Sequence, residues 1–282
     1  MANFDFDQAE GLRRMLAGPK PRVITFLSAT SADDKSSMLV NFGASLAGAG
    51  SDVILLDACA VSKGVSSWLG VSGGATLLDV VRKERTIDEV MRPMAQGFWL
   101  ASLAHDSLSS NRNSTVERSG LSNAFNMLVA KADVIVVDSD IGSGESFPTP
   151  AMASGEIVIQ VSANPTSIKI AYSMIKRLNS ELGRRPFGVL VTGASDREAS
   201  VIYGNMAQTA SRYLAIQLNS MGSVPADEHV HRAARLGRSV IDAYPLARAS
   251  VAFRRLAGRF AIASLPSVNH HGLPSSGANI GT

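Results

Sequence analysis

A lysine and a serine, Lys35 and Ser36, stand side by side after an apolar run, as in a phosphate-binding loop. In such a loop the lysine reaches the β- and γ-phosphates and the hydroxyl binds magnesium. The stretch 29–34 contains no glycine and carries Asp33 and Asp34 instead. Glycines let backbone N–H groups approach phosphate oxygens closely, whereas two carboxylates repel a triphosphate. The pattern therefore predicts a nucleotide site that has been altered.

Two further carboxylates are predicted to face this pair. Asp57 and Asp138 each follow a short apolar run directly, at 53–56 and 134–137. The carboxyl ends of strands in a parallel sheet form its usual ligand-binding edge. Because magnesium prefers oxygen ligands, Ser36, Asp57 and Asp138 are the candidate metal ligands if a nucleotide binds.

The same residues can also stabilise the fold without a ligand. Asp57 can cap the turn that follows it, and Asp138 can hydrogen-bond Ser36 and the loop backbone. The lysine can pair with a nearby carboxylate, that of Asp33, Asp34, Asp57 or Asp138. No residue is predicted to be catalytic.

Short apolar runs alternate with helical patterns from Arg22 onward. The runs lack the alternation of half-exposed strands, which favours strands covered on both faces. They span 23–27, 53–56, 98–103, 134–137, 157–161 and 188–191. Helices are predicted at 36–48, 76–82, 86–92, 115–131, 166–182, 197–217, 227–236 and 249–263. The order predicts an α/β fold with a doubly wound, mostly parallel sheet flanked by helices.

The N-terminal stretch 7–17 has the pattern of a short helix. Asp7 can cap it, and Glu10 lies three residues later in capping-box position. The Gly-Pro-Lys-Pro run at 18–21 then breaks the helix. We therefore expect three parts: an N-terminal helix with its linker (1–21), an α/β domain (22–263) and a disordered tail (264–282).

Composition narrows the class of protein. The 282 residues are 45% apolar, enough for a substantial core. No run of 18 apolar residues exists and the N-terminus has no signal-peptide pattern, so we expect no membrane span. The single cysteine, Cys59, excludes an internal disulfide and fits a reducing cytoplasm. No histidine lies near it in the pattern, which argues against a cysteine nucleophile.

The charge is concentrated near the C-terminus. The net charge of +3 is too small to indicate nucleic-acid binding, although 230–263 holds seven arginines and one acid. The favoured interpretation is a solvated basic face, and DNA binding through these arginines is a weaker alternative. The helix at 249–263 is basic and amphipathic, so it can lie on anionic lipid. We favour a closing helix that packs on the sheet, with its apolar side formed by Val251, Leu256, Phe260 and Ile262.

Four segments, taken in order, resemble the FlhG/FleN group of MinD/ParA-type ATPases. These bacterial proteins control the number and placement of flagella. The segments are 7–13, 55–58, 136–142 and 164–172. The similarity runs from residue 7 to about residue 260, and the opening Asp-Gln-Ala-x-x-Leu-Arg joined to a MinD-like body is its most specific feature.

The resemblance implies that the N-terminal motif is an activator helix. In that family it acts on FlhF, a GTPase related to the signal-recognition particle. Gln8 would lie beside the partner's GTP and order the attacking water, since an amide can accept from water and donate to phosphate. The alternative is a surface glutamine on a capped helix. The motif residues are Asp7, Gln8, Ala9, Leu12 and Arg13.

The resemblance also implies ATP and magnesium as ligands, but the chain departs from the family at several points. Thr30 stands where the family has a second lysine, Cys59 replaces an acid that orients water, and Thr192 replaces a base-contacting asparagine. The loop glycines are replaced by Ser31, Ala32 and Asp34. The residues that retain the nucleotide-site pattern are Lys35, Ser36, Asp57, Asp138 and Gly142.

Two functions remain open from the sequence. One is a regulator with little or no ATP turnover that binds an FlhF-like GTPase, and also a flagellar switch-ring protein or a flagellar transcription activator. The other is a slow ATPase that dimerises on ATP and visits the membrane reversibly. Both imply a cytoplasmic protein with peripheral contact at the inner membrane or the cell pole. A homodimer is compatible with both, and DNA is not an expected partner.

Overall fold

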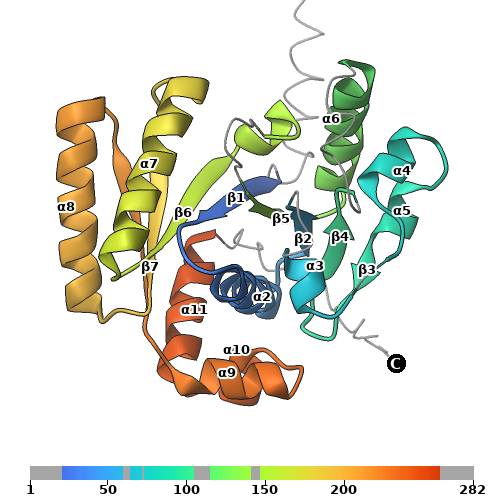
Figure 1. The fold of residues 1–282 in the computed structure, drawn as a ribbon. Coiled ribbons are helices and arrows are strands. Elements are labelled where there is room, and N and C mark those ends of the chain that lie inside the picture. The colour runs from blue at the N-terminus through green and yellow to red at the C-terminus, as the bar shows by residue number, and fades with distance from the viewer. Residues whose placement is uncertain (1–20, 60–63, 72, 105–114, 141–146, 261–282) are drawn as a thin grey trace, which may run out of the picture.

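The computed structural model describes residues 21–59, 64–71, 73–104, 115–140 and 147–260 (Figure 1). In this part of the chain, one eight-stranded sheet carries helices on both faces. The strands are β1 (Arg22–Ser28), β2 (Val53–Ala58), β3 (Arg92–Pro93), β4 (Trp99–Ser102), β5 (Val134–Ser139), β6 (Glu156–Ser162), β7 (Phe187–Thr192) and β8 (Leu218–Val224). The helices are α2 (Ala32–Gly48), α3 (Val65–Trp68), α4 (Leu77–Val81), α5 (Ile87–Val90), α6 (Thr115–Val129), the 3-10 turn η1 (Pro150–Ala153), α7 (Pro165–Leu182), α8 (Asp196–Leu214), α9 (Glu228–Arg235), α10 (Val240–Ala243) and α11 (Arg248–Phe260).

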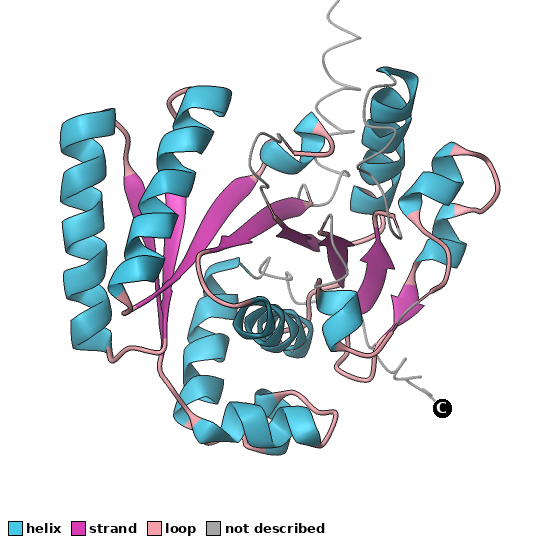
Figure 2. Cartoon of the chain, in the orientation of Figure 1, coloured by secondary structure: helices cyan, strands magenta, loops and turns pink. Residues whose placement is uncertain are grey.

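The strands lie in the order β3-β4-β2-β5-β1-β6-β7-β8. Only the short β3 runs antiparallel to its neighbour; the other neighbouring pairs are parallel (Figure 2). The crossovers from β1 to β2 and from β5 to β6 run towards opposite edges of the sheet. β2, β5 and β1 are parallel neighbours, so their carboxyl ends lie next to one another. The predicted doubly wound, mostly parallel sheet is confirmed.

The central strands are buried on both faces, as their unbroken apolar runs predict. In β1, Ile24 and Phe26 pack on the layer that contains α2 and α11, and Leu27 packs on the opposite layer with α6 and α7. In β5, Val134 and Val136 face the first layer, whereas Ile135 and Val137 face the second. This three-layer packing holds the strand ends of β1, β2 and β5 rigidly.

The structure corrects the predicted end of α8 and adds an edge strand. The predicted helix 197–217 ends at Leu214, because Ala215 has a left-handed φ of 53° that terminates it. β8 follows at Leu218, in a stretch that was not predicted to be a strand. β8 mixes polar and apolar residues, and only its first and last residues are buried. It therefore lacks the apolar run that identifies the central strands.

Smaller elements also differ from the expectation. The predicted helix 86–92 ends at Val90 because Met91 is extended, and a residue that precedes a proline, here Arg92, disfavours helical angles. The one-turn helices α3 and α10 were not predicted, since four residues show no period. The expected helix at 7–17, with its motif residues, and the tail 264–282 lie outside the described residues.

α11 closes the fold, as the favoured interpretation of its basic amphipathic pattern states. Its apolar side packs on α2 and β8. The Phe260 ring meets Phe42 edge-on with centroids 5.6 Å apart, and Phe42 meets Phe26 in the same way at 5.5 Å. Val251 is wrongly assigned to this side, because it is 45% exposed, and Ile262 lies outside the described residues. No described helix combines the length and the apolar character that crossing a bilayer requires.

We expect Phe260→Ala to lower the free energy of unfolding by about 3–5 kcal/mol, the usual cost of removing a buried phenylalanine. Val251→Ala on the same helix is the control and should change it by less than about 0.5 kcal/mol. Urea unfolding followed by circular dichroism measures both. Equal effects of the two substitutions would contradict this packing of α11.

Candidate functional site

The stretch expected to be a phosphate loop is the first turn of α2. The helix was predicted to begin at 36 but begins at Ala32, with Ser31 as its N-cap. The Asp34 N–H donates to Ser31 Oγ at 3.1 Å, and that hydroxyl donates to the Asp34 carboxylate at 2.7 Å. Serine is a strong N-cap, and carboxylates in a first turn are favoured by the helix dipole. The replacements of the loop glycines are therefore good helix-starting residues.

Two backbone N–H groups of this turn, those of Asp34 and Lys35, already have partners within the chain. The Lys35 N–H donates to Ser31 O at 3.0 Å, as in any helix. Among the described non-glycine residues, only Lys83 and Ala215 have a positive φ, so the stretch 29–37 makes no left-handed turn of the kind a glycine loop makes. The Thr30 N–H donates back to Ser28 Oγ at 3.0 Å.

The side chain of Lys35 points into a buried ion pair. Its Nζ lies 2.6 Å from Asp138 Oδ1, and both side chains are nearly inaccessible to solvent. The ammonium also donates to the carbonyl oxygen of Ser139 at 3.0 Å. Burial disfavours the charged lysine, but the charge of Asp138 and the contacts with Asp138 and Cys59 together outweigh burial and hold the pKa of Lys35 above its ordinary value. The lysine is therefore charged and internally neutralised at neutral pH.

The two strand-end carboxylates hold the segment that begins α3. Asp57 and Asp138 are opposite each other across β2 and β5. Asp138 Oδ2 accepts from the Val65 N–H at 2.8 Å, and Asp57 Oδ2 accepts from the Ser66 N–H at 2.9 Å. The predicted turn-capping alternative for Asp57 is thus observed, since its other oxygen accepts from the Cys59 N–H at 3.2 Å. Burial, and then the charge of Asp138, raise the pKa of Asp57.

Gly64 lies so close to Asp57 that a larger residue would displace the Asp57 carboxylate. A Cβ on Gly64 would lie 2.1 Å from Asp57 Oδ1, far inside van der Waals contact. Sequence reasoning missed Gly64 and the N–H groups of Val65 and Ser66. Backbone donors have no side-chain signature, and the glycine was the one available signal.

Cys59 completes the cluster. Its Sγ is 3.4 Å from Lys35 Nζ. Burial and the nearby charge of Asp138 raise the pKa of the thiol above its ordinary value, so it is protonated and a poor nucleophile. Ligand atoms of Asp57, Cys59 and Asp138 lie within 4.8 Å of one another.

Other predicted site residues are placed as follows. The Ser36 hydroxyl is buried and has no hydrogen-bond partner among the described residues, so the expected bond from Asp138 to Ser36 is not found. Thr192 Oγ1 accepts from the side chain of Gln160 at 3.2 Å. Gly142 and the N-terminal motif residues lie outside the described part of the chain.

The arrangement does not fit a magnesium-bound triphosphate. Oxygen atoms of Ser36, Asp57 and Asp138 have the chemistry that magnesium prefers, but the Cys59 thiol does not. The cation that neutralises Asp138 is already present as Lys35, and the N–H groups of Thr30, Asp34 and Lys35 have internal partners.

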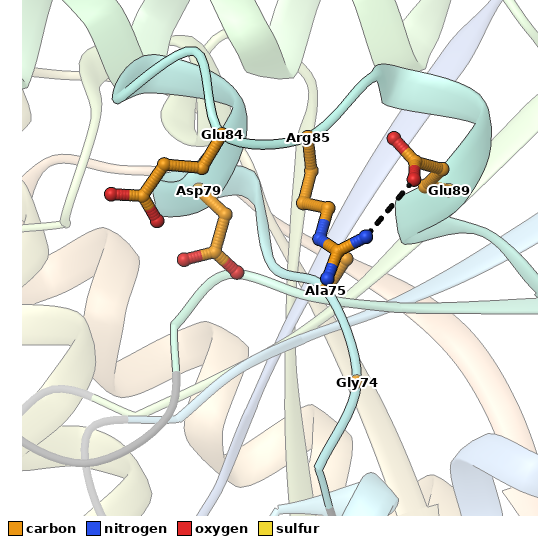
Figure 3. A pocket seen from close by; sticks show the side chains of 6 residues that line it. All are labelled: Gly74, Ala75, Asp79, Glu84, Arg85 and Glu89. Carbon is orange, nitrogen blue, oxygen red and sulfur yellow. Dashed lines mark hydrogen bonds and ion pairs between the residues drawn. The ribbon is translucent and has the colours of Figure 1, made fainter.

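A pocket of about 630 Å³ lies away from this site, beside α4 and α5 (Figure 3). Its carboxylates serve the fold. Asp79 accepts from the Thr76 N–H at 2.8 Å, and Glu89 accepts from the Thr86 N–H at 2.7 Å. Glu89 also pairs with Arg85 at 3.2 Å. Two of the three carboxylates that line the pocket, Asp79 and Glu89, are therefore engaged in helix caps.

The basic C-terminal surface is also neutralised in part. Arg232 pairs with Glu228 at 2.9 Å, and Arg238 pairs with Asp242 at 2.6 Å. Arg259 donates to the carbonyl oxygen of Ser220 at 2.6 Å. These contacts are consistent with the favoured interpretation, a solvated basic face.

The sequence is 31% identical over 247 residues to the antiactivator FleN of Pseudomonas aeruginosa, a match that covers 87% of this chain and 88% of that protein. The chain belongs to the FleN family. An uncharacterised ATP-binding protein of Methanocaldococcus jannaschii is 23% identical over 237 residues, or 84% of this FleN-family chain and 86% of that protein. No family model matches the sequence.

Solved structures show the same fold. The cell division ATPase MinD of Pyrococcus furiosus superposes with a TM-score of 0.63 at 20% identity, over 84% of this chain and 97% of that chain. The ATP complex of an aspartate-to-alanine variant of Cyanothece McdA superposes with a TM-score of 0.64 at 17% identity, over 88% and 99%. The FleN-family chain thus has the MinD/ParA fold of P-loop ATPases.

We expect Lys35→Met to lower the free energy of unfolding by about 3–5 kcal/mol, because it leaves the Asp138 carboxylate buried without its counter-charge. Lys35→Met/Asp138→Asn should regain most of the loss, since asparagine removes the charge and still accepts from the Val65 N–H. The exposed Lys176→Met is the control. Urea denaturation at pH 7 measures the free energy of unfolding of the wild-type protein and of the three variants. A Lys35→Met protein as stable as wild type would contradict a stabilising role of the ion pair.

Proposed function

We propose that this FleN-family chain regulates flagellar biosynthesis or placement by binding other proteins, on a scaffold impaired in ATP binding and hydrolysis. The observation that carries the second part is the buried contact of Lys35 with Asp138. The lysine that would meet a nucleotide's phosphates is already neutralised by the protein's own carboxylate.

The energetic cost of admitting ATP supports the proposal. Lys35 would have to leave Asp138, and separating a buried pair costs about 3–5 kcal/mol. The first turn of α2 would have to unwind as well, which releases the Ser31 cap at about 1 kcal/mol. A micromolar dissociation constant corresponds to a binding free energy of about 8 kcal/mol. The two costs would offset a large share of that free energy.

Hydrolysis is disfavoured on separate grounds. Thr30 stands in place of the family's second lysine, and a protonated Cys59 stands in place of the acid that orients water. Loss of one donor aimed at transition-state charge typically costs about 3–4 kcal/mol. Two such losses reduce turnover by several orders of magnitude.

One observation favours the alternative, a slow ATPase that dimerises on ATP. The buried hydroxyl of Ser36 has no partner among the described residues, and it belongs to a residue type that binds magnesium in relatives. Two similar proteins are described as an ATP-binding protein and as an ATP complex. The nucleotide experiment below separates the two functions.

The partner side of the proposal rests on the N-terminal motif and on the relatives. We assign 1–21 as an arm, 22–263 as the scaffold and 264–282 as a tail. The arm would stimulate an FlhF-like GTPase through Gln8, with Asp7, Ala9, Leu12 and Arg13 forming the binding helix.

The name antiactivator, given to the Pseudomonas relative, supports a transcription activator as a further partner. MinD of Aquifex aeolicus occurs in a complex with MinC, which supports protein binding by this scaffold. The proposed location is the cytoplasm, with contact at the inner membrane or cell pole.

We expect calorimetry with ATP and magnesium to detect no micromolar binding by the wild-type chain. The loop variant Thr30→Lys/Ser31→Gly/Ala32→Gly/Asp34→Gly should bind at least about tenfold more tightly, because it removes the N-cap and restores the glycines. Adding Lys35→Ala to that variant is the control and should abolish the gain. Micromolar binding by wild type that Lys35→Ala removes would instead establish the slow ATPase.

We expect the full chain to increase the GTP turnover of an FlhF-like GTPase, and Gln8→Ala to remove most of the increase. Loss of a group that positions the attacking water should cost about 10²-fold or more in the stimulated rate. Gln217→Ala, an exposed glutamine outside the helices and strands, is the matched control. Equal stimulation by the wild-type and Gln8→Ala proteins would rule out the activator role.

A further inference from the structure

α7 carries a groove along one flank, with a volume of about 290 Å³. We call it the α7 groove and define it by the five residues that line it: Lys169, Ile170, Ser173, Met174 and Arg177. Ile170 is 42% exposed, and Met174 is half-buried against the core. Because the two side chains are one helical turn apart, they form a continuous apolar floor.

The rim of the α7 groove is basic. Lys169 and Lys176 are exposed and form no ion pair with any described residue. Arg177 pairs with Glu181 at 2.7 Å. An occupant with apolar side chains for the floor and carboxylates for the rim would match this surface.

The chain itself contains one segment with that composition. Phe4, Asp5, Phe6 and Asp7 alternate two aromatic rings with two carboxylates. The other stretches outside the described residues, 60–63, 105–114, 141–146 and 261–282, contain no Phe, Tyr or Trp. Charge and composition therefore both select the N-terminus as the occupant.

The spacing of the two partners also matches. In an extended segment, Phe4 and Phe6 lie on the same side about 6.6 Å apart. Ile170 and Met174 are separated by about 6 Å along α7. With both rings on this floor, Asp5 and Asp7 lie on the other side of the extended segment. The long, flexible side chains of Lys169 and Lys176 can extend past the floor to reach them there.

The chain is long enough to reach the groove. α7 connects two parallel strands and so runs antiparallel to them, which returns its C-terminal end to the sheet edge where β1 begins. β1 pairs directly with β6, the strand that leads into α7. With the expected helix formed, 8–17 spans about 15 Å and 18–21 adds up to about 13 Å, whereas the 18 residues of α7 span about 27 Å.

We propose that Phe4–Asp7 docks in the α7 groove of its own chain and so restrains the adjoining activator motif. The docking stands on the groove alone, and its regulatory meaning rests on the proposed function. A GTPase that takes up the motif would have to displace the N-terminus, because Asp7 belongs to both contacts.

The test is photo-crosslinking in the full chain, with Phe4→p-benzoylphenylalanine. After irradiation and trypsin digestion, the expected product joins the N-terminal peptide to 170–176, in a protein of monomer mass. Ile170→Asp should reduce its yield at least about tenfold, the equivalent of about 1.4 kcal/mol. Val201→Asp, which changes an exposed apolar residue on α8, should leave it unchanged.

Each other outcome overturns the docking. Crosslinks to other peptides, a dimer-mass product or equal yields from Ile170→Asp and Val201→Asp would exclude it. None of these results involves the GTPase, so the activator role would survive them. If the docking holds and the activator role is correct, Ile170→Asp should raise GTPase stimulation severalfold over Val201→Asp at a subsaturating concentration.

Discussion

The contact between Lys35 and Asp138 is the constraint on which the candidate site depends. It neutralises a fully buried carboxylate, and that carboxylate in turn fixes the first N–H of α3. Asp57, directly across the sheet, fixes the next one. Lys35, on α2, thus supports a network that joins β5, β2, α2 and α3. The Lys35 ammonium in this network already contacts two groups of the protein, the Asp138 carboxylate and the carbonyl oxygen of Ser139.

The fold was largely predictable because its central strands are buried on both faces, and unbroken apolar runs of this kind are a strong local signal. β8 was missed because an edge strand needs little apolar character, and one-turn helices such as α10 have no period to detect. The end of α8 depends on the backbone angle of Ala215, which its residue type does not indicate.

The candidate site was predictable in its side chains but not in its backbone. The strand-end carboxylates and the lysine are predictable from their positions after apolar runs. Asp138, the observed partner of Lys35, is one of the four carboxylates that the sequence offers. The first turn of α2 was not predicted, because Ser31 and Asp34 were interpreted as replacements of the glycines of a phosphate loop. Their capping chemistry, a serine followed three residues later by an acid, was the available signal. The donors of Val65 and Ser66 come from tertiary packing, which no local pattern encodes.

The edge strand β8 has a consequence for self-association. An open sheet edge invites a strand from a neighbouring molecule, and proteins avoid this by irregular or polar edges. Here the pairing of β8 with β7 shifts at Val189 and Leu190, Gly222 has a φ of 101°, and Asn219 and Ser220 are exposed. Even where many copies crowd together, this border is a poor template for fibril growth.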